Sequence, residues 1–161
     1  LKRVLLKNNI KRIIAYSAIK KEIDLTGICQ FCQEKNIPVY FPKYNQDKED
    51  YDFIMVHDIK SGFEVGKYGI LEPKFSSPSL SLSDLNDKNT TWLIPGIVYD
   101  ASGNRIGYGK GYYDEFLNKV KGLKVGIAHS LQIYNGILPQ NQADIPMDLV
   151  ITDQEIMFKN P

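Results

Sequence analysis

At 161 residues, with 43% hydrophobic and 24% charged side chains, the chain is long enough for one globular domain with a sizeable core. A formal net charge of +1 gives no general attraction for duplex nucleic acid, and no apolar run approaches the length of a membrane span. We therefore expect a single domain over residues 1–161 with neither nucleic acid nor a membrane as its partner.

The first half of the chain contains short apolar runs around one helical pattern. Residues 1–7 have the composition of the end of an amphipathic helix and begin without Met, so we expect that preceding residues are missing from this sequence. Asp24 can cap a helix that ends near Asn36, ahead of Pro38. Strands are expected at residues 13–16, at 39–41, where Pro42 ends the run, and at 51–57.

The second half alternates apolar runs with turns and one further helix. Residues 76–89, rich in Ser, Asp and Asn, predict a loop with little regular structure, and a helix is expected from Tyr112 to Gly122. Strands are expected at residues 91–94, 97–99, 125–128 and 149–151, with a short edge strand at 156–158. Apolar strands without alternation, interleaved with helices, favour an α/β fold: a Rossmann-like, three-layer αβα domain with a mostly parallel central sheet.

Two cysteines, Cys29 and Cys32, form a Cys-x-x-Cys pair that could suggest redox chemistry or a metal. The chain has no second cysteine pair and no nearby His to complete a zinc site. Since residues 25–36 have helical periodicity, we expect the two thiols to be small core residues. Such sparse cysteine usage fits a reducing, cytoplasmic setting.

The segment 104–114 is rich in glycine and predicts a binding site for an anion. Its glycines alternate with large residues, which leaves backbone N–H groups uncovered, and they are Gly107, Gly109 and Gly111. Arg105 and Lys110 add positive charge, and the helix that begins near Tyr112 adds its positive end. We expect this loop, after a strand of a parallel sheet, to bind a nucleotide polyphosphate.

The spacing of these glycines differs from the common phosphate loops. No Ser or Thr follows the Lys, as a Walker loop requires, and the glycines are two residues apart rather than in a Gly-x-Gly-x-x-Gly pattern. From the residues alone, a solvated glycine-rich surface turn remains the alternative.

Several segments together carry a resemblance to a known family. They are Pro95 and Gly96, Tyr99 and Asp100, and residues 103–114, with weaker agreement at residues 15–17, 22–24, 68–73, 138–139, 144–148 and 151–152. In these segments the chain resembles the 5-formyltetrahydrofolate cyclo-ligase family, also called 5,10-methenyltetrahydrofolate synthetase. Within the central motif, Ile106 stands where the family has Leu. The family's N-terminal helix, which carries a Lys and an Arg for ATP, has no counterpart here, and we favour a trimmed sequence.

The resemblance implies an enzyme that uses ATP to convert 5-formyltetrahydrofolate into 5,10-methenyltetrahydrofolate, with Mg²⁺ as cofactor. Its partners would then be the two small-molecule substrates, and we expect a monomer. A non-catalytic relative that binds nucleotide or folate is the alternative. A sugar-phosphate isomerase or an acyl-CoA-type enzyme is a third reading, which rests on fold analogy alone.

The resemblance also implies roles for individual residues. Arg105 and Lys110 are the implied catalytic residues. The implied ATP contacts are Arg105, Ile106, Gly107, Tyr108, Gly109, Lys110, Gly111, Tyr112 and Tyr113. The implied folate contacts are Ser17, Glu22 and Tyr112, and the implied Mg²⁺ ligands are Asp114 and Asp144.

Some of these residues also have a simpler interpretation. Asp114 could merely interact with the helix dipole, Asp144 could shape a turn before Pro146, and Glu22 could be solvated. The two histidines, His57 and His129, are assigned no role.

Overall fold

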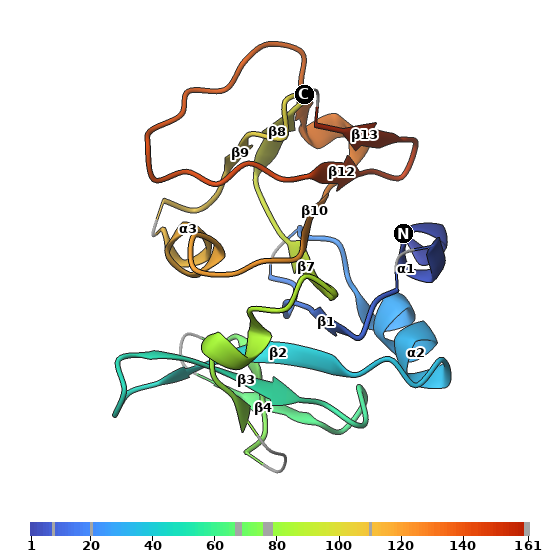
Figure 1. Cartoon of the computed structure of the whole chain (residues 1–161), viewed down its shortest axis with the longest axis vertical. Helices are drawn as coiled ribbons and strands as arrows, with labels where there is room; N and C mark the ends of the chain where they lie inside the picture. Colours follow the sequence, from blue (N-terminus) through green and yellow to red (C-terminus); the bar gives the residue numbers. More distant parts are fainter. Residues whose placement is uncertain (8, 20, 67–68, 76–78, 110, 160–161) are drawn as a thin grey trace.

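An eight-stranded sheet forms the centre of the protein in the computed structural model, which describes all residues except 8, 20, 67–68, 76–78, 110 and 160–161 (Figure 1). The strand order is β13-β12-β10-β7-β1-β2-β3-β6. Their bounds are β1 Arg12–Ile14, β2 Val39–Asn45, β3 Asp50–Met55, β6 Ser79–Leu80, β7 Thr90–Ile94, β10 Leu123–Ile127, β12 Leu149–Ile151 and β13 Ile156–Phe158. Two residues discussed above, Tyr68 and Lys110, lie outside the described part of the chain.

The five inner strands from β12 to β2 are parallel neighbours, whereas β13, β3 and β6 are added antiparallel at the two sides. Parallel strands need crossover connections, and the helices that make them cover the sheet. The mostly parallel sheet predicted from the sequence is therefore confirmed.

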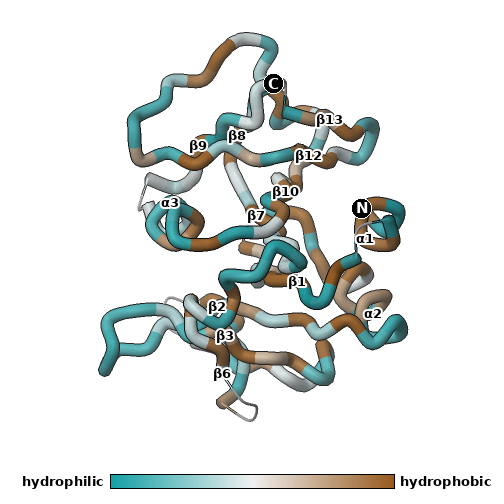
Figure 2. Tube along the Cα trace, viewed as in Figure 1, coloured by the Kyte–Doolittle hydropathy of each residue, from teal (hydrophilic) through white to brown (hydrophobic). Residues whose placement is uncertain are grey.

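Both faces of the sheet are buried, which explains the lack of alternation in the strands. In β7, Leu93 packs into one apolar cluster and its neighbours Trp92 and Ile94 pack into the other. Ile13 and Ile14 of β1 divide between the clusters in the same way. Figure 2 shows hydrophobic residues along these inner strands and hydrophilic ones at the far end of the β2–β3 connection.

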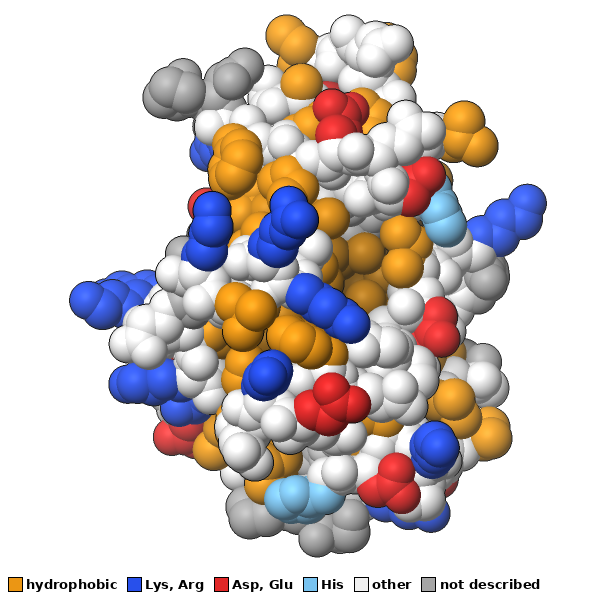
Figure 3. All heavy atoms as spheres, turned by 90° about the vertical axis from the view of Figure 1, so that its right-hand side faces the viewer, with side chains coloured by type: hydrophobic (Ala, Val, Ile, Leu, Met, Phe, Trp, Pro, Cys, Tyr) orange, Lys and Arg blue, Asp and Glu red, His pale blue; other side chains and the backbone are white. Residues whose placement is uncertain are grey.

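The helices lie on opposite faces of the sheet (Figure 1). Helices α1 (Lys2–Lys7) and α2 (Thr26–Glu34) contribute Leu5, Cys29 and Cys32 to the first cluster. Figure 3 shows this side of the molecule, where basic side chains lie among hydrophobic ones. Helix α3 (Tyr112–Leu117) covers the other face, where the rings of Phe116 and Trp92 have centroids 5.6 Å apart. The three-layer αβα arrangement is thus confirmed.

Helix α2 confirms the interpretation of the cysteines. Cys29 and Cys32 are free thiols that are 1% and 0% exposed, and burial raises the pKa of Cys29 to about 12 and that of Cys32 to about 11. Both thiols are therefore protonated core residues at neutral pH. Asp24 accepts the backbone N–H of Thr26 at 2.9 Å, and the positive φ of Asn36 (55°) marks the end of the helix.

Three expected boundaries were wrong. Pro42 does not end β2, because its neighbour β1 pairs only as far as Tyr40, so the missing N–H of Pro42 faces no ladder on that side. The loop 76–89 contains β6 and a 3₁₀ turn, η2 (Ser83–Leu85). Helix α3 ends five residues before Gly122, and Val120 is buried from the turn that follows.

Two small sheets lie outside the central sheet. One has the order β11-β8-β9, with β8 Val98–Asp100, β9 Arg105–Ile106 and β11 Ile133–Tyr134, and a 3₁₀ turn, η3 (Ser130–Gln132), precedes β11. The other is a hairpin of β4 (Phe63–Val65) and β5 (Leu71–Pro73). Of these strands only β8 was expected, at residues 97–99; the others are short and have no continuous apolar run, so only long-range pairing reveals them. Within the described ranges, no helix has the length and hydrophobicity needed to cross a membrane.

Candidate active site

A buried carboxylate builds the turn that leads into the glycine-rich loop. Asp100 is 0% exposed and accepts four hydrogen bonds, each 2.9 Å long, from the backbone of Ser102, Asn104 and Leu138 and from the Asn104 side-chain amide. At Gly103 the φ of +82° and the close carbonyl of Met147 exclude any side chain. This network fixes the course of the chain just before Arg105.

The Pro-Gly and aromatic residues of the motif have a packing role. Tyr99 is 0% exposed and its hydroxyl donates to the carbonyl of Ile94 at 2.7 Å. A Cβ at Gly96 would lie 2.8 Å from the Tyr99 ring, and one at Gly126 would lie 2.6 Å from it. Glycine at both positions lets β10 and the connection between β7 and β8 approach the ring, and the Tyr99 hydrogen bond holds β8 against the end of β7.

Arg105 lies on β9, opposite Tyr99, with a side chain that is only 5% exposed. Its Nη2 lies 2.9 Å from both carboxylate oxygens of Asp114, and its guanidinium carbon lies 5.6 Å from the centre of the Tyr113 ring. The Arg105 Nε is buried and has no hydrogen-bond partner in the described part of the chain. A buried donor left in this way is suited to an incoming oxyanion, which would form a charge-assisted bond.

Asp114 and Asp144 belong to neighbouring segments. Besides Arg105, Asp114 accepts a longer 3.4 Å bond from the backbone N–H of Ile145. The Asp144 carboxylate accepts bonds from the backbone and side chain of Asn141, at 2.8 and 3.1 Å. Among the described residues, no group of three or more His, Cys, Asp or Glu could hold a metal. Two carboxylates do fit Mg²⁺ of the kind that is bound together with substrate phosphates.

The glycines of the loop are needed for its backbone conformation. Gly109 and Gly111 have φ values of +79° and +67°, a region that other residues rarely adopt, and open space surrounds both positions. A Cβ at Gly107 would lie 2.9 Å from the Arg105 guanidinium. Tyr108 and Ile106 are exposed beside them, 47% and 36% respectively. The loop is thus an open turn, and Lys110 at its centre lies outside the described residues.

A cleft of about 320 Å³ opens beyond the end of β1. Its polar residues include Ser17 and Glu22, two of the three residues implied for folate, and Glu22 accepts the backbone N–H of Ile19 at 2.9 Å. Its remaining lining residues are Tyr16, Ala18, Asp24, Leu25, Thr26, Cys29, Phe41, Ile59, Phe63 and Leu71. An apolar wall beside a few polar groups is typical of a small-molecule site.

Tyr113 lies beside Arg105, whose guanidinium carbon is 5.6 Å from the centre of its ring. Burial raises the pKa of Tyr113, the negative charge of Glu22 raises it further, and the positive charge of Arg105 opposes them. Tyr112 instead is 45% exposed and packs against the Tyr51 ring at 6.0 Å, and it is not among the described residues that line the cleft.

The sequence did not reveal the part played by the hairpin. Phe63 of β4 and Leu71 of β5 line the cleft with Ser17 and Glu22, although they lie some fifty residues further along the chain. No pattern in such short strands indicates which face meets the substrate.

A second cavity, of about 420 Å³, lies near the starts of β7 and β10, at the opposite end of the sheet. Its lining includes Asn9, Lys88, Gly122 and Asp148 and none of residues 95–114, which hold the central motif. Ligands of parallel sheets bind at the carboxyl ends of the strands, so we assign the active site to the smaller cleft and the loop.

Comparison with known proteins agrees with this assignment. A probable 5-formyltetrahydrofolate cyclo-ligase of Caenorhabditis elegans is 28% identical over 162 residues, which cover 92% of this chain and 75% of the relative. A 5-formyltetrahydrofolate cyclo-ligase of Haemophilus influenzae is also 28% identical, covering 85% and 73% of the two chains. The solved structure of Aquifex aeolicus 5,10-methenyltetrahydrofolate synthetase matches with a TM-score of 0.77 and 33% identity, covering 94% of this chain and 73% of the other.

The family model of these proteins matches residues 2–153, nearly the whole chain. The chain therefore belongs to the 5-formyltetrahydrofolate cyclo-ligase family.

Proposed function

We propose that the protein catalyses the ATP-dependent cyclisation of 5-formyltetrahydrofolate to 5,10-methenyltetrahydrofolate, with release of ADP and phosphate. The observation that carries the proposal is one juxtaposition within a family match of nearly full length: Ser17 and Glu22 of the cleft follow β1, the glycine-rich loop follows β7 by way of β8 and β9, and β1 and β7 are adjacent parallel strands. A site for phosphate and a site for a second substrate are thereby adjacent, as a transfer between them requires.

The reaction needs positioning more than a protein nucleophile. The formyl group on N5 is an amide, so its oxygen is a poor leaving group. Transfer of the γ-phosphoryl group to that oxygen breaks the bond to the β-phosphate and releases ADP. The folate N10 then attacks the activated carbon, which closes the ring, and loses its proton; phosphate departs with the former formyl oxygen and leaves the methenyl bridge between N5 and N10.

The loop supplies charge neutralisation for this transfer. The Arg105 side chain is held in one orientation by Asp114, and its free Nε can donate to a phosphate oxygen. Gly107, Gly109 and Gly111 let backbone N–H groups approach the polyphosphate, and we assign Lys110 a second charge contact there. Because Arg105 is already buried and oriented, little reorganisation is needed when ATP binds.

The cleft supplies recognition of the folate. The carboxylate of Glu22 can accept the paired N–H donors of a pterin ring, and Ser17 adds a hydroxyl on the same side. Leu25 and Phe63 give the ring an apolar wall. We assign Tyr113, beside Arg105, a place near the transferred phosphoryl group, and its raised pKa keeps the hydroxyl protonated as a hydrogen-bond donor.

For the metal, we assign Asp114 and Asp144 as the residues that would hold Mg²⁺ together with phosphate oxygens. Bound there, the ion would neutralise charge on the transferred phosphoryl group. Asp114 would then serve both the metal and Arg105, so one carboxylate would orient both positive groups.

We also propose that the protein acts as a monomer in the cytoplasm, since the residues of both sites come from a single chain and its thiols are unpaired. Size-exclusion chromatography with light scattering measures the first point, and imaging of a tagged chain in its host cell measures the second.

Turnover tests the central proposal. Incubation with 5-formyltetrahydrofolate, ATP and Mg²⁺ should give the absorbance of the methenyl product, with one ADP formed per folate converted and no product when ATP is omitted. Binding of both substrates without product would identify the non-catalytic relative instead. The variant Arg105→Ala, checked for an unchanged melting temperature, should bind folate but lose turnover.

A further inference from the structure

Lys43 is a nearly buried lysine that the expected site residues do not include. It lies on β2, its side chain is 8% exposed, and its ammonium group contacts both strands of the β4–β5 hairpin. The Nζ atom lies 2.7 Å from a carboxylate oxygen of Glu64 on β4 and 2.8 Å from the carbonyl of Pro73 on β5. It also lies 4.2 Å from the centre of the Phe75 ring.

These contacts use the bonding capacity of the ammonium group. A lysine has three N–H donors and no acceptor, and here two face hydrogen-bond acceptors while an aromatic face lies beside the nitrogen. Lys43 is therefore occupied by the hairpin and does not serve as a substrate ligand. The ammonium in turn holds the pKa of Glu64 below its ordinary value.

The hairpin that Lys43 contacts forms one wall of the substrate cleft. Phe63 of β4 and Leu71 of β5 line that cleft together with Leu25 and Cys29 from the α2 region. The Phe63 ring also meets the edge of Phe41 on β2, with 4.8 Å between centroids. Any movement of the hairpin away from β2 would thus widen the cleft.

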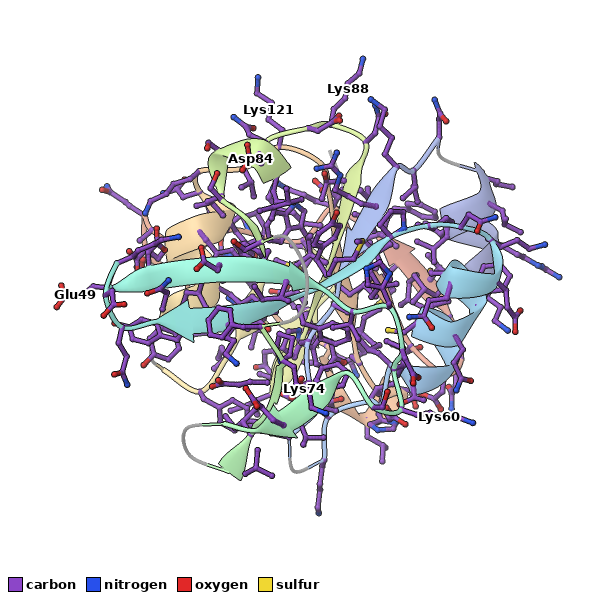
Figure 4. The ribbon with its side chains drawn as sticks, turned by 90° about the horizontal axis from the view of Figure 1, so that it is seen from below. Glu49, Lys60, Lys74, Asp84, Lys88 and Lys121 are labelled. Carbon is purple, nitrogen blue, oxygen red and sulfur yellow. The ribbon has the colours of Figure 1, made fainter. Side chains whose placement is uncertain are left out.

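Side chains, rather than a shared ladder, join the hairpin to the central sheet. In the described part of the chain, β4 and β5 pair only with each other, as a separate two-stranded sheet. A hairpin of this kind is marginally stable by itself in water. Figure 4 shows the hairpin beside β2 and β3, with Lys74 directly after it, while Glu49 marks the distant tip of the β2–β3 connection.

We propose that Lys43 is a positioning residue for the folate site: it fixes the β4–β5 hairpin against β2 and so sets the width of the cleft that holds the pterin. The identity of the ligand rests on the proposed function above, whereas the contact between Lys43 and the hairpin does not. The consequence is specific to one substrate, because the loop that holds ATP is anchored separately by Asp100.

The test compares Lys43→Met with Lys43→Arg and with a matched control. Lys48→Met is the control, since Lys48 makes a similar ion pair, 2.8 Å from Asp52, at the tip of the β2–β3 connection and away from the hairpin. For each variant, the measurements are KM for 5-formyltetrahydrofolate, KM for ATP, kcat, the melting temperature, and hydrogen exchange at the backbone amides of Gly66 and Lys74, which bond within the hairpin region.

Lys43→Met should raise KM for the folate about tenfold or more, while KM for ATP stays within about twofold. In Lys43→Met, hydrogen exchange at Gly66 and Lys74 should also become faster. Lys43→Arg should restore most of the folate KM and of the slow exchange, and Lys48→Met should leave both quantities unchanged. Unchanged folate KM with unchanged exchange in Lys43→Met would overturn the proposal. An equal rise in both KM values with a lower melting temperature would also overturn it, since that pattern indicates general destabilisation.

The experiment separates this inference from the proposed function. If the unmodified protein neither binds nor converts 5-formyltetrahydrofolate, the function is wrong, and hydrogen exchange still decides whether Lys43 fixes the hairpin. If the unmodified protein converts folate and Lys43→Met does so with the same KM, only the role of Lys43 is wrong.

Discussion

The two walls of the active site are held in place by different kinds of interaction. On the nucleotide side, one buried carboxylate, Asp100, accepts four hydrogen bonds and closes the turn before Arg105. On the folate side, the β4–β5 hairpin is attached to β2 through Lys43 and a pair of phenylalanine rings. The first attachment fixes backbone atoms, and the second fixes side chains at the surface of a small sheet.

This difference indicates which substrate site is preformed. Asp100 and its donors form a buried network in which each of these groups is paired, so we expect the side proposed to bind phosphate to be rigid before ATP arrives. A short hairpin tied by side chains opens at lower cost, so the folate side can adjust to its ligand. Substitutions on the two sides should consequently affect different steps, and the following four experiments examine that expectation.

The largest effect is expected from the nucleotide side. Arg105→Ala should lower kcat/KM for ATP by about 100–1000-fold, because removal of one preorganised donor to developing charge costs about 3–4 kcal/mol in the transition state. Steady-state kinetics with varied ATP measure it. Lys119→Ala is the control, since Lys119 is an exposed cation after the same helix whose 3.6 Å contact with Glu115 is solvated. If kcat/KM for ATP fell by a similar factor in both variants, Arg105 would have no special role.

The folate side should respond selectively to a change at Glu22. Glu22→Gln should raise KM for the folate by about 10–100-fold, since a hydrogen bond to a charged group contributes about 1.5–3 kcal/mol. ATP affinity should be nearly unchanged, and the amide oxygen can still accept the Ile19 N–H. Separate equilibrium titrations with ATP and with folate measure both affinities. A fall in ATP affinity with unchanged folate affinity would contradict the assignment.

The metal assignment predicts a smaller effect, which depends on the Mg²⁺ concentration. Asp114→Asn and Asp144→Asn should each raise the Mg²⁺ concentration needed for half-maximal rate several-fold. The free-energy cost to this Mg²⁺ dependence in the double variant should be smaller than the sum of the two single costs. ADP affinity with and without Mg²⁺, measured by calorimetry, gives a second readout. Glu115→Gln, an exposed neighbour of Asp114, is the control. If both Mg²⁺ curves are unshifted and only the melting temperatures fall, the carboxylates have structural roles alone.

The smallest expected change is in stability, at the residue that fixes the loop. Asp100→Asn should destabilise the fold by about 1–3 kcal/mol, because the new NH₂ group would face N–H donors that now have an acceptor. A domain of this size should then melt about 2–10 °C lower, measurable by calorimetry. Asp84→Asn, which alters an exposed turn bonded to Ser81, should change the melting temperature far less. Equal shifts would mean that the Asp100 network is not special.

Much of the fold was predictable because local patterns determine it. The apolar runs of β1, β7, β10 and β12 indicated strands buried on both faces, and the helical spacing around Cys29 and Cys32 indicated α2. The boundaries failed where long-range pairing decides them: β2 continues through Pro42 because β1 has already ended there. Likewise β4, β5 and β9 are short and lack the continuous apolar run that marks β1 and β12, so the sequence gives no signal for them.

The sequence by itself determined the glycine-rich loop that we propose binds an anion. Gly109 and Gly111 need positive φ, and Arg105 adds a charge to the same short segment, both of which are local properties. Only the tertiary structure decided the partners: Arg105 with Asp114, Tyr113 with Arg105, and Lys43 with the hairpin at the cleft. Each of these contacts joins residues that lie apart along the chain. The contact of Tyr113 also distinguishes it from the adjacent Tyr112, which is exposed. The packing of the sheet, which no local pattern encodes, selects among such arrangements.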